Sequence, residues 1–221
     1  MMIRVRFYLL VCIFLSLLYF PLFLNLDFFP FQIWDEAREA IHAYEMYHSG
    51  NYLVAQYEGS PDMWSLKPPM LTWLQCFFIH FLGFGELAIR LPSALSALGT
   101  CLLVLQFITN ITAKPAMGYI SAILLLCFDS FTNIHASRTG DIDALLTFFL
   151  TWSMIQCYLF LFSNRKHRHI LLFFLSLTCA VLTKGIAGLL FLPVYLFLLV
   201  YKLLIINPPH FNYYKNQSNT T

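Results

Sequence analysis

Charged residues are scarce in this sequence. Only 11% of its 221 residues are Asp, Glu, Lys or Arg, whereas a soluble domain of this size carries about a quarter. So few charges cannot cover a water-exposed surface, which excludes a soluble globular domain. Hydrophobic residues make up 59% of the chain, and its 23 phenylalanines and 12 tyrosines suit lipid contact and interfacial aromatic belts. The chain is therefore predicted to be an all-α polytopic membrane protein.

Cysteine spacing that would indicate a metal site or a disulfide framework is also missing. The six cysteines stand singly inside apolar runs, where they are typical of small buried hydrophobes. Neither a zinc site nor a redox motif is indicated. No internal repeat appears, which argues against an inverted-repeat transporter. The formal net charge of +2 says little about partners, and we expect no nucleic-acid partner.

Long apolar runs define the candidate membrane spans, because a helix needs about 20 apolar residues to cross a bilayer. The first run follows Arg4 and Arg6, but it is too long for a signal peptide and lacks a cleavage site, so we expect it to be retained. A membrane domain is predicted over 1–206, followed by a polar, disordered tail at 207–221. The six predicted spans are 7–26, 87–108, 115–134, 144–163, 169–187 and 188–206.

The apolar segment 68–85 is ambiguous, because it is short and contains Gln75 and His80. Loop charge decides its placement. With six spans and a cytoplasmic N-terminus, the basic cluster 165–169 stays inside, as the positive-inside rule requires, and all 11 acidic residues lie outside. A seventh crossing would move the basic cluster outside. The segment 68–85 is therefore predicted to be an interfacial or re-entrant helix within a long outer loop, 27–86.

This outer loop is predicted to contain an amphipathic helix. It begins at Trp34 and Asp35 and ends near Gly50, a typical helix-ending residue. A short extended piece is expected to follow at 52–54. The three- and four-residue spacing of Ala37, Ala40, Ile41, Tyr44 and Tyr47 predicts one apolar stripe, so the helix is expected to be amphipathic and to lie beside the membrane.

Charged residues recur at the outer ends of the predicted helices, and each has a structural alternative. Asp35 and Glu36 open a helix, where acids cap free N–H groups, so capping and catalysis carry equal weight on spacing alone. Lys67 precedes two prolines that set a helix start, and a lysine at a membrane surface is more often an anchor than a ligand. Arg90 lies one turn inside a span, where a charge is costly unless it is paired, and Glu86 is an available partner.

Two further groups lie at the outer ends of later spans. Asp141 and Asp143 open the fourth span beside Arg138, although capping needs only one carboxylate. Lys184 ends the fifth span, and the glycine that follows it allows a close backbone approach. Taken singly, each residue favours a structural role. Together they place carboxylates and cations on one face of one membrane.

That combination suits the transfer of a group from a lipid phosphate. An outward carboxylate such as Asp35 would act as general base for an acceptor hydroxyl. Cations are needed beside the phosphate leaving group, and the candidates are Lys67, Arg90, Arg138 and Lys184.

Six segments in order resemble the GT-C glycosyltransferases, especially the branch that contains the lipid A aminoarabinose transferases and the protein O-mannosyltransferases. They are WDEAREA, SGNYLV, LKPPMLTWL, GELAIRLPSAL, RTGDIDALLTFF and LTKGIAGLL. The resemblance implies a GT-C-type helical bundle that transfers a sugar from a polyprenyl-phosphate donor on the extracytoplasmic face. It also implies that Asp35, with Glu36 beside it, is the catalytic acid, that Lys67 contacts the donor phosphate, and that Asp143 is a site carboxylate with Asp141 as its near rival.

The sequence departs from the family pattern in two ways. Leu66 stands where the aminoarabinose transferases have an acid, so the resemblance supports no metal or donor role at that position. Family members are also much longer, with further spans and usually a C-terminal domain. We therefore expect a natural fragment, a split subunit whose missing helices come from a partner chain, or the product of a gene interrupted downstream.

The sequence thus predicts a glycosyltransferase of the bacterial inner membrane with a cytoplasmic N-terminus. Its acceptor would be a lipid, a glycan or a protein. No metal ligands are assigned and no cofactor is expected, although a divalent cation stays open. The alternative is a non-catalytic subunit or a transporter that binds an anionic lipid. A transporter would place its polar groups near the bilayer midplane, whereas these gather at one surface.

Overall fold

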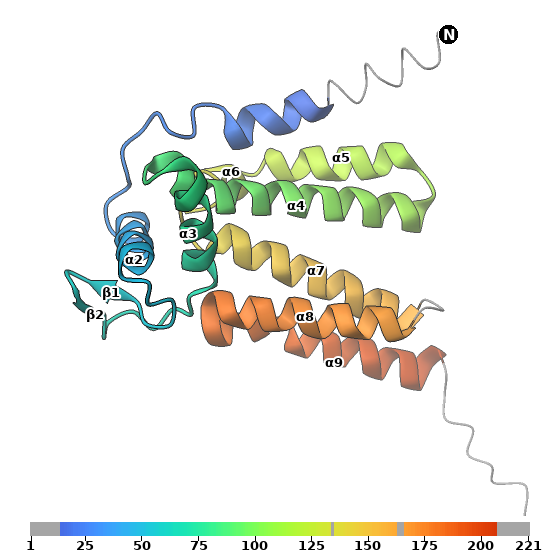
Figure 1. Ribbon diagram of the computed structural model, residues 1–221. Coiled ribbons are helices and arrows are strands. Elements are labelled where there is room, and N and C mark those ends of the chain that lie inside the picture. The colour runs from blue at the N-terminus through green and yellow to red at the C-terminus, as the bar shows by residue number, and fades with distance from the viewer. Residues whose placement is uncertain (1–13, 134, 163–165, 207–221) are drawn as a thin grey trace, which may run out of the picture.

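The computed structural model describes residues 14–133, 135–162 and 166–206, and apolar helices lying side by side form most of it (Figure 1). A helix over Phe14–Phe23 packs on α4 (Glu86–Thr112) and α5 (Pro115–Leu126). Two short elements connect helices of the bundle, α6 (Asp129–Thr132) and the 3-10 helix η1 (Gly185–Leu189), and the π-helix η2 (Lys202–Ile206) is the last described element. The long elements are α4 (Glu86–Thr112), α5 (Pro115–Leu126), α7 (Asp143–Phe162), α8 (Lys166–Lys184) and α9 (Leu192–Tyr201).

The remaining elements gather at one end of this bundle (Figure 1). They are α2 (Asp35–Ser49), the strands β1 (Gln56–Tyr57) and β2 (Ser60–Pro61), and α3 (Met70–Leu82). The two strands pair antiparallel with Tyr57 opposite Ser60. Because successive bundle helices run in opposite directions, the starts of α4 and α7 and the end of α8 also lie at this end.

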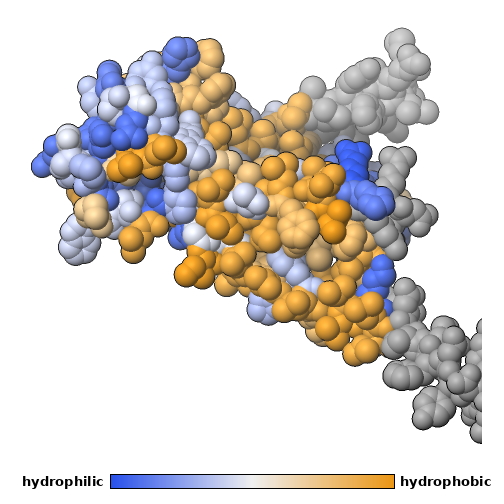
Figure 2. Space-filling model, turned by 60° about the horizontal axis from the view of Figure 1, so that its bottom comes forward, coloured by the Kyte–Doolittle hydropathy of each residue, from blue (hydrophilic) through white to orange (hydrophobic). Residues whose placement is uncertain are grey.

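The surface polarity follows the same division. Figure 2 shows hydrophilic residues at the end that carries α2 and the strands, a hydrophobic band over the bundle, and further hydrophilic residues at the opposite end. The sequence predicts this arrangement for a bundle that crosses a bilayer. The basic residues Lys114, Arg168 and Lys202 lie near the helix ends opposite α2.

The predicted spans agree with the helices in position but not in length. In the described ranges, three helices are long and apolar enough to cross a membrane: Glu86–Thr112, Asp143–Phe162 and His167–Leu189. The predicted span 115–134 is interrupted, because α5 ends at Leu126 and its 12 residues reach only about 18 Å. The structure therefore does not confirm a count of six. Part of the first span, part of the cluster 165–169 and the tail 207–221 lie outside the described residues.

Helix α3 occupies the segment whose placement was ambiguous. It runs across the end of the bundle rather than along it (Figure 1), as expected for an interfacial helix. Leu71 and Ile79 are buried against its neighbours. Gln75 is fully buried, and its amide donates to the carbonyls of Ile89 and Gly140, each at 3.2 Å. These two hydrogen bonds therefore link α3 to α4 and to the loop before α7.

Helix α2 begins and ends as predicted, with Gly50 in the left-handed conformation donating to Met46 O. Of the predicted apolar stripe, Ala40 is buried and Tyr47 packs partly buried against the core, whereas Tyr44 is exposed. The residues that α2 buries are Glu36, Glu39, Ala40, His42, Ala43 and Met46. Three of them are ionisable, and their burial is tolerated because each has a charged partner. The extended piece expected at 52–54 is also misplaced, since the strands begin at Gln56.

Candidate active site

Asp35 opens α2 at the polar end of the molecule. Its side chain is 57% exposed, and its Oδ1 accepts a hydrogen bond from Lys67 Nζ at 3.0 Å. This bond, with weaker effects of nearby positive charge, lowers the pKa of Asp35 despite partial burial. The preceding residue, Trp34, has a φ of 83° and an 83% exposed side chain. Asp35 is therefore an ionised, accessible carboxylate.

Lys67 lies between two carboxylates of α2. Besides Asp35, it has Glu39 Oε1 at 3.2 Å, and Glu39 is buried. Burial alone would lower the pKa of Lys67, but the charges and hydrogen bonds of Glu39 and Asp35 outweigh it and raise that pKa. Residues 35 and 39 are one helical turn apart, so they share a face toward the lysine.

Glu36 forms a buried ion pair with Arg90 of α4 and has no exposed surface. Its Oε1 accepts from Arg90 Nε at 2.6 Å and from the N–H of Gly140 at 2.7 Å. Its Oε2 accepts from Arg90 Nη2 at 2.9 Å and from the N–H of Gln32 at 2.7 Å. Both oxygens are thus occupied, and neither is directed to solvent. This geometry favours a structural role over the predicted catalytic one.

The guanidinium of Arg90 is equally committed. Its five hydrogen bonds match its five N–H donors: two go to Glu36, and three go to the carbonyls of Leu26, Phe29 and Pro30. No donor is left over for a phosphate, so the structure argues against the predicted phosphate contact. The partner of Arg90 is also Glu36, 54 residues away in sequence, and not Glu86 as expected.

Arg138 contacts the C-terminal end of the first described helix. Its guanidinium donates to Pro21 O at 2.9 Å and to Leu24 O at 2.8 Å, at the C-terminal end of the helix over Phe14–Phe23. Carbonyls at a helix end lack intrahelical donors, and an arginine satisfies them well. This contact favours a capping role, although it leaves other N–H donors of the guanidinium for a ligand.

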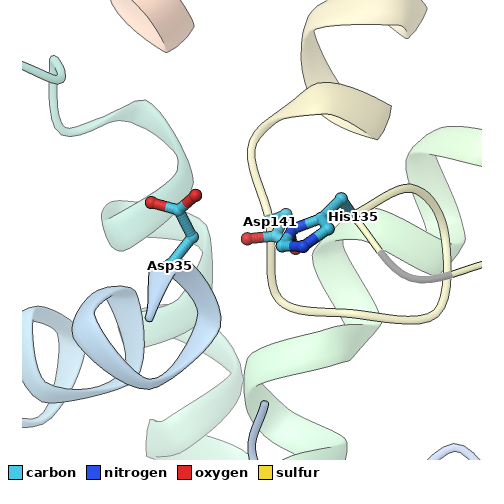
Figure 3. Close-up of side chains that lie close together, drawn as sticks. All are labelled: Asp35, His135 and Asp141. Carbon is cyan, nitrogen blue, oxygen red and sulfur yellow. Dashed lines mark hydrogen bonds and ion pairs between the residues drawn. The ribbon is translucent and has the colours of Figure 1, made fainter. Parts of the chain in front are cut away.

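The loop between α6 and α7 brings a further carboxylate toward Asp35. Asp141 is 4% exposed, and its Oδ2 accepts from Thr139 at 2.7 Å and lies 3.1 Å from His135 Nδ1. Burial raises the pKa of Asp141, helped by the negative charges of Glu36 and Asp35. Single ligand atoms of Asp35, His135 and Asp141 all lie within 4.8 Å of one another (Figure 3).

Asp143 and Lys184 form a second ion pair beside this group. Asp143 begins α7, Lys184 ends α8, and the lysine ammonium donates to the Asp143 carboxylate. Both side chains are partly exposed, and the positive charge of Lys184 also lowers the pKa of Asp35. Gly188 allows η1, which follows Lys184, to pack closely on α8, because a Cβ at this position would come within 2.5 Å of the backbone of Ala180.

The candidate site residues that the sequence predicted therefore fall into two groups. Five residues gather at one place, where Asp141 is buried and the other four are at least partly exposed: Asp35, Lys67, Asp141, Asp143 and Lys184. Three others are engaged in structural contacts: Glu36, Arg90 and Arg138.

Sequence reasoning missed Glu39 and His135. The spacing of Asp35 and Glu39 by four residues was a usable signal for the first. Nothing in the sequence distinguished His135, a single histidine in a loop.

A second charged cluster, also missed, supports the segment that carries Lys67. Arg38 binds both carboxylate oxygens of Asp62, at 2.8 to 2.9 Å, and His42 Nε2 lies 2.8 Å from Asp62 Oδ2. Burial opposes ionisation of Asp62, but the hydrogen bonds from His42 and Arg38 outweigh it and lower its pKa to about 2. A cavity of about 200 Å³ lies between this cluster and Lys67.

Comparison with known families now identifies the chain. Residues 66–211 match the family described as dolichyl-phosphate-mannose-protein mannosyltransferase. The chain belongs to this family. It is also 33% identical over 168 residues to an uncharacterised protein of Aquifex aeolicus (strain VF5), covering 75% of the present chain and 36% of that relative.

Solved structures of ArnT from Cupriavidus metallidurans share the fold. The form bound to undecaprenyl phosphate superposes with a TM-score of 0.76 at 23% identity, over 87% of this family member and 35% of the ArnT chain. The apo form gives 0.73 at 21% identity, over 92% and 37%. The GT-C-type helical bundle that the sequence predicted is thus confirmed, and so is an integral membrane protein. The chain spans about a third of the length of these relatives.

Proposed function

We propose that this protein transfers a sugar from a polyprenyl-phosphate donor to an acceptor, with Asp35 as general base. The observation that carries the proposal is the ion pair between Asp35 and Lys67. It sets an ionised, 57% exposed carboxylate beside a cation, at the polar end of an apolar bundle. A base for the acceptor and a counter-ion for the leaving phosphate are the two groups that this transfer needs.

The pairing also implies an order of events. The donor phosphate, which is anionic, competes with Asp35 and Glu39 for Lys67. When Lys67 turns to the phosphate, Asp35 loses the hydrogen bond that lowers its pKa and becomes the stronger base. Donor binding thereby activates the base. Lys184, held by Asp143 in the same way, is the second cation proposed to contact the phosphate.

The chemical step is an inverting displacement at the anomeric carbon. Asp35 removes the proton of the acceptor hydroxyl, the acceptor oxygen forms a bond to the anomeric carbon, and the bond from that carbon to the phosphate oxygen breaks. The electron pair leaves with the polyprenyl phosphate, whose charge Lys67 and Lys184 stabilise. Asp143 keeps Lys184 in position.

The comparisons support the donor class without fixing the sugar. The family description names a dolichyl-phosphate mannose, and an ArnT structure holds undecaprenyl phosphate, so both point to polyprenyl-phosphate chemistry. We propose a lipid, glycan or protein acceptor and a site on the extracytoplasmic face of the bacterial inner membrane. The gathering of Asp35, Asp141 and Asp143 at one end of the bundle, with Lys114 and Arg168 at the other, supports this orientation.

The alternative of a transporter or an accessory lipid-binding subunit is less well supported. A transporter places its polar groups near the bilayer midplane. Here the charged groups lie at helix ends, beside α2 and α3, and the family match favours an enzyme.

The decisive experiment is transfer or hydrolysis of a labelled polyprenyl-phosphate sugar by membranes that carry this chain alone. The proposal expects activity in the wild type and its loss in Asp35→Asn, which keeps the size of the side chain and removes the base. Asp27→Asn makes the same change at another exposed acid and should leave activity unaltered. Equal activity in Asp35→Asn would reject Asp35 as the base, and an inserted chain without activity would reject transfer by this chain alone.

A further inference from the structure

Three side chains from distant segments meet beside the proposed base. Asp35 comes from the first turn of α2, whereas His135 and Asp141 come from the loop that precedes α7. Figure 3 shows the Asp35 side chain at the start of its helix, beside His135 and Asp141 of the loop. One ligand atom from each residue lies within 4.8 Å of the others. A hundred residues of sequence separate the two segments, so the fold has assembled this group.

The spacing of the donor atoms fits one cation. His135 Nδ1 and Asp141 Oδ2 are 3.1 Å apart. Two ligands that each bind a metal at about 2.0–2.2 Å, at an angle near a right angle, are separated by about 3 Å. Asp35 is 57% exposed and its Oδ1 accepts from Lys67, which leaves its Oδ2 without a hydrogen bond from the described residues and available to the ion. The Thr139 hydroxyl, 2.7 Å from Asp141 Oδ2, orients that carboxylate as an outer-shell partner does in metal sites.

The charges around this group leave room for a cation. Lys67 is shared by Asp35 and Glu39, Lys184 is paired with Asp143, and Arg90 is taken up by Glu36. Among the described side chains, those that contact the Asp141 carboxylate are Thr139 and His135, neither of which carries a permanent positive charge. A buried carboxylate without a permanent cation is costly unless it binds a proton or a metal.

We propose that Asp35, His135 and Asp141 form a binding site for one divalent transition-metal cation. One nitrogen and two carboxylate oxygens suit Mn²⁺ or Zn²⁺ better than Ca²⁺, which prefers oxygen ligands alone. Three protein ligands leave coordination positions open, and Asp35 and His135 are exposed enough for a substrate oxygen to reach them. The cation would bind a phosphate oxygen or the hydroxyl of the acceptor at these open positions. A hydroxyl bound in this way becomes more acidic.

The site shares Asp35 with the proposed base, but the two proposals are tested separately, because metal binding is measured without any donor or acceptor. The test uses the whole chain, purified in detergent, stripped with a chelator and titrated with Mn²⁺, with free Mn²⁺ followed by electron paramagnetic resonance. The expected result is one bound ion per chain. His135→Gln and Asp141→Asn should each weaken binding by about tenfold or more.

Matched substitutions away from the group separate the site from general effects. His48→Gln and Asp129→Asn replace the same residue types at exposed positions and should leave the affinity unchanged. His135→Gln retains the fold, because its side chain is 58% exposed, and this is checked by circular dichroism. Failure of the wild-type chain to bind Mn²⁺ or Zn²⁺ would overturn the proposal. An affinity of His135→Gln and Asp141→Asn for Mn²⁺ equal to that of the wild type would also overturn it. His135 and Asp141 would then be a simple hydrogen-bonded pair.

The two proposals fail in distinguishable ways. A chain that binds the ion and transfers no sugar contradicts the proposed function alone. A chain that transfers sugar at full rate after complete removal of metal, and that binds none, contradicts the cation site alone.

Discussion

Arg90 and Glu36, 54 residues apart, form an ion pair in which both side chains are almost completely buried, at 3% and 0% exposure. Through this pair, α4 is joined to the start of α2, the chain segment before it and Gly140. Asp35 is the next residue along the chain from Glu36, so the pair determines where the proposed base lies.

Breaking this pair should destabilise the protein strongly. Glu36→Gln or Arg90→Met leaves one buried group without its charged partner, which costs about 3–5 kcal/mol. Thermal unfolding in detergent should show a large fall in midpoint for either variant, and the double variant Glu36→Met with Arg90→Met should recover part of it. Glu58→Gln, at an exposed position of the strand turn, is the control. Small effects in both single variants would contradict the structural role.

Replacing Lys67 should weaken both donor binding and the fold. Lys67 is 32% exposed and pairs with the buried carboxylate of Glu39 as well as with Asp35, so Lys67→Gln leaves Glu39 without its charged partner and should lower the thermal midpoint in detergent. The same variant should bind the donor about tenfold more weakly or worse, because a charged contact to phosphate is lost. Donor titration of the transfer assay measures this, with Lys114→Gln at the opposite end of the bundle as control. An unchanged donor affinity would remove Lys67 from the phosphate site.

Stability should fall as the pH rises through the pKa of the His42 side chain. Burial disfavours the charged ring, but hydrogen bonds and charges from Glu39 and Asp62 outweigh it and raise the pKa above 6.5. The charged ring therefore stabilises the fold fully below about pH 6.5, and this contribution is lost as the pH rises through the raised pKa.

His42→Gln should remove that part of the pH dependence between pH 6.5 and 9, measured as the thermal midpoint in detergent. The carboxylate of Asp62 behaves in the opposite sense. Because its folded pKa is about 2, its contribution is present above pH 3.8 and is lost as the pH falls toward 2. A wild-type profile that stays flat from pH 6.5 to 9 would contradict the assignment to His42.

Gly140 should tolerate no side chain. A Cβ there would lie 2.5 Å from Ile89 Cγ2 and 3.2 Å from Ile89 O. Gly140→Ala should therefore cost about 1–3 kcal/mol. Because the same loop carries Asp141, the variant should also lose transfer activity. Gly85→Ala, where a Cβ meets nothing within 4 Å, is the matched control, and equal stability of the two variants would contradict the packing argument.

Several features of the protein were determined by the sequence itself. The scarcity of charge required a membrane protein, and the apolar runs located the bundle helices, because hydropathy acts locally along the chain. Gly50 and the prolines before α3 marked helix ends for the same reason: backbone preferences depend on the residue and its neighbours. The ordered motifs indicated the family, which the comparison confirmed.

Tertiary structure alone decided how the charges are divided between stability and the site. Asp35 and Glu36 are adjacent in sequence, yet one is exposed and the other is buried against Arg90. The spacing gave both carboxylates the same two interpretations, because helix capping and catalysis use the same residue types. The partner of Glu36 comes from a segment 54 residues away, and His135, six residues before Asp141, carried no motif. Electrostatic interactions depend on distance in space, and only the packed helices set those distances.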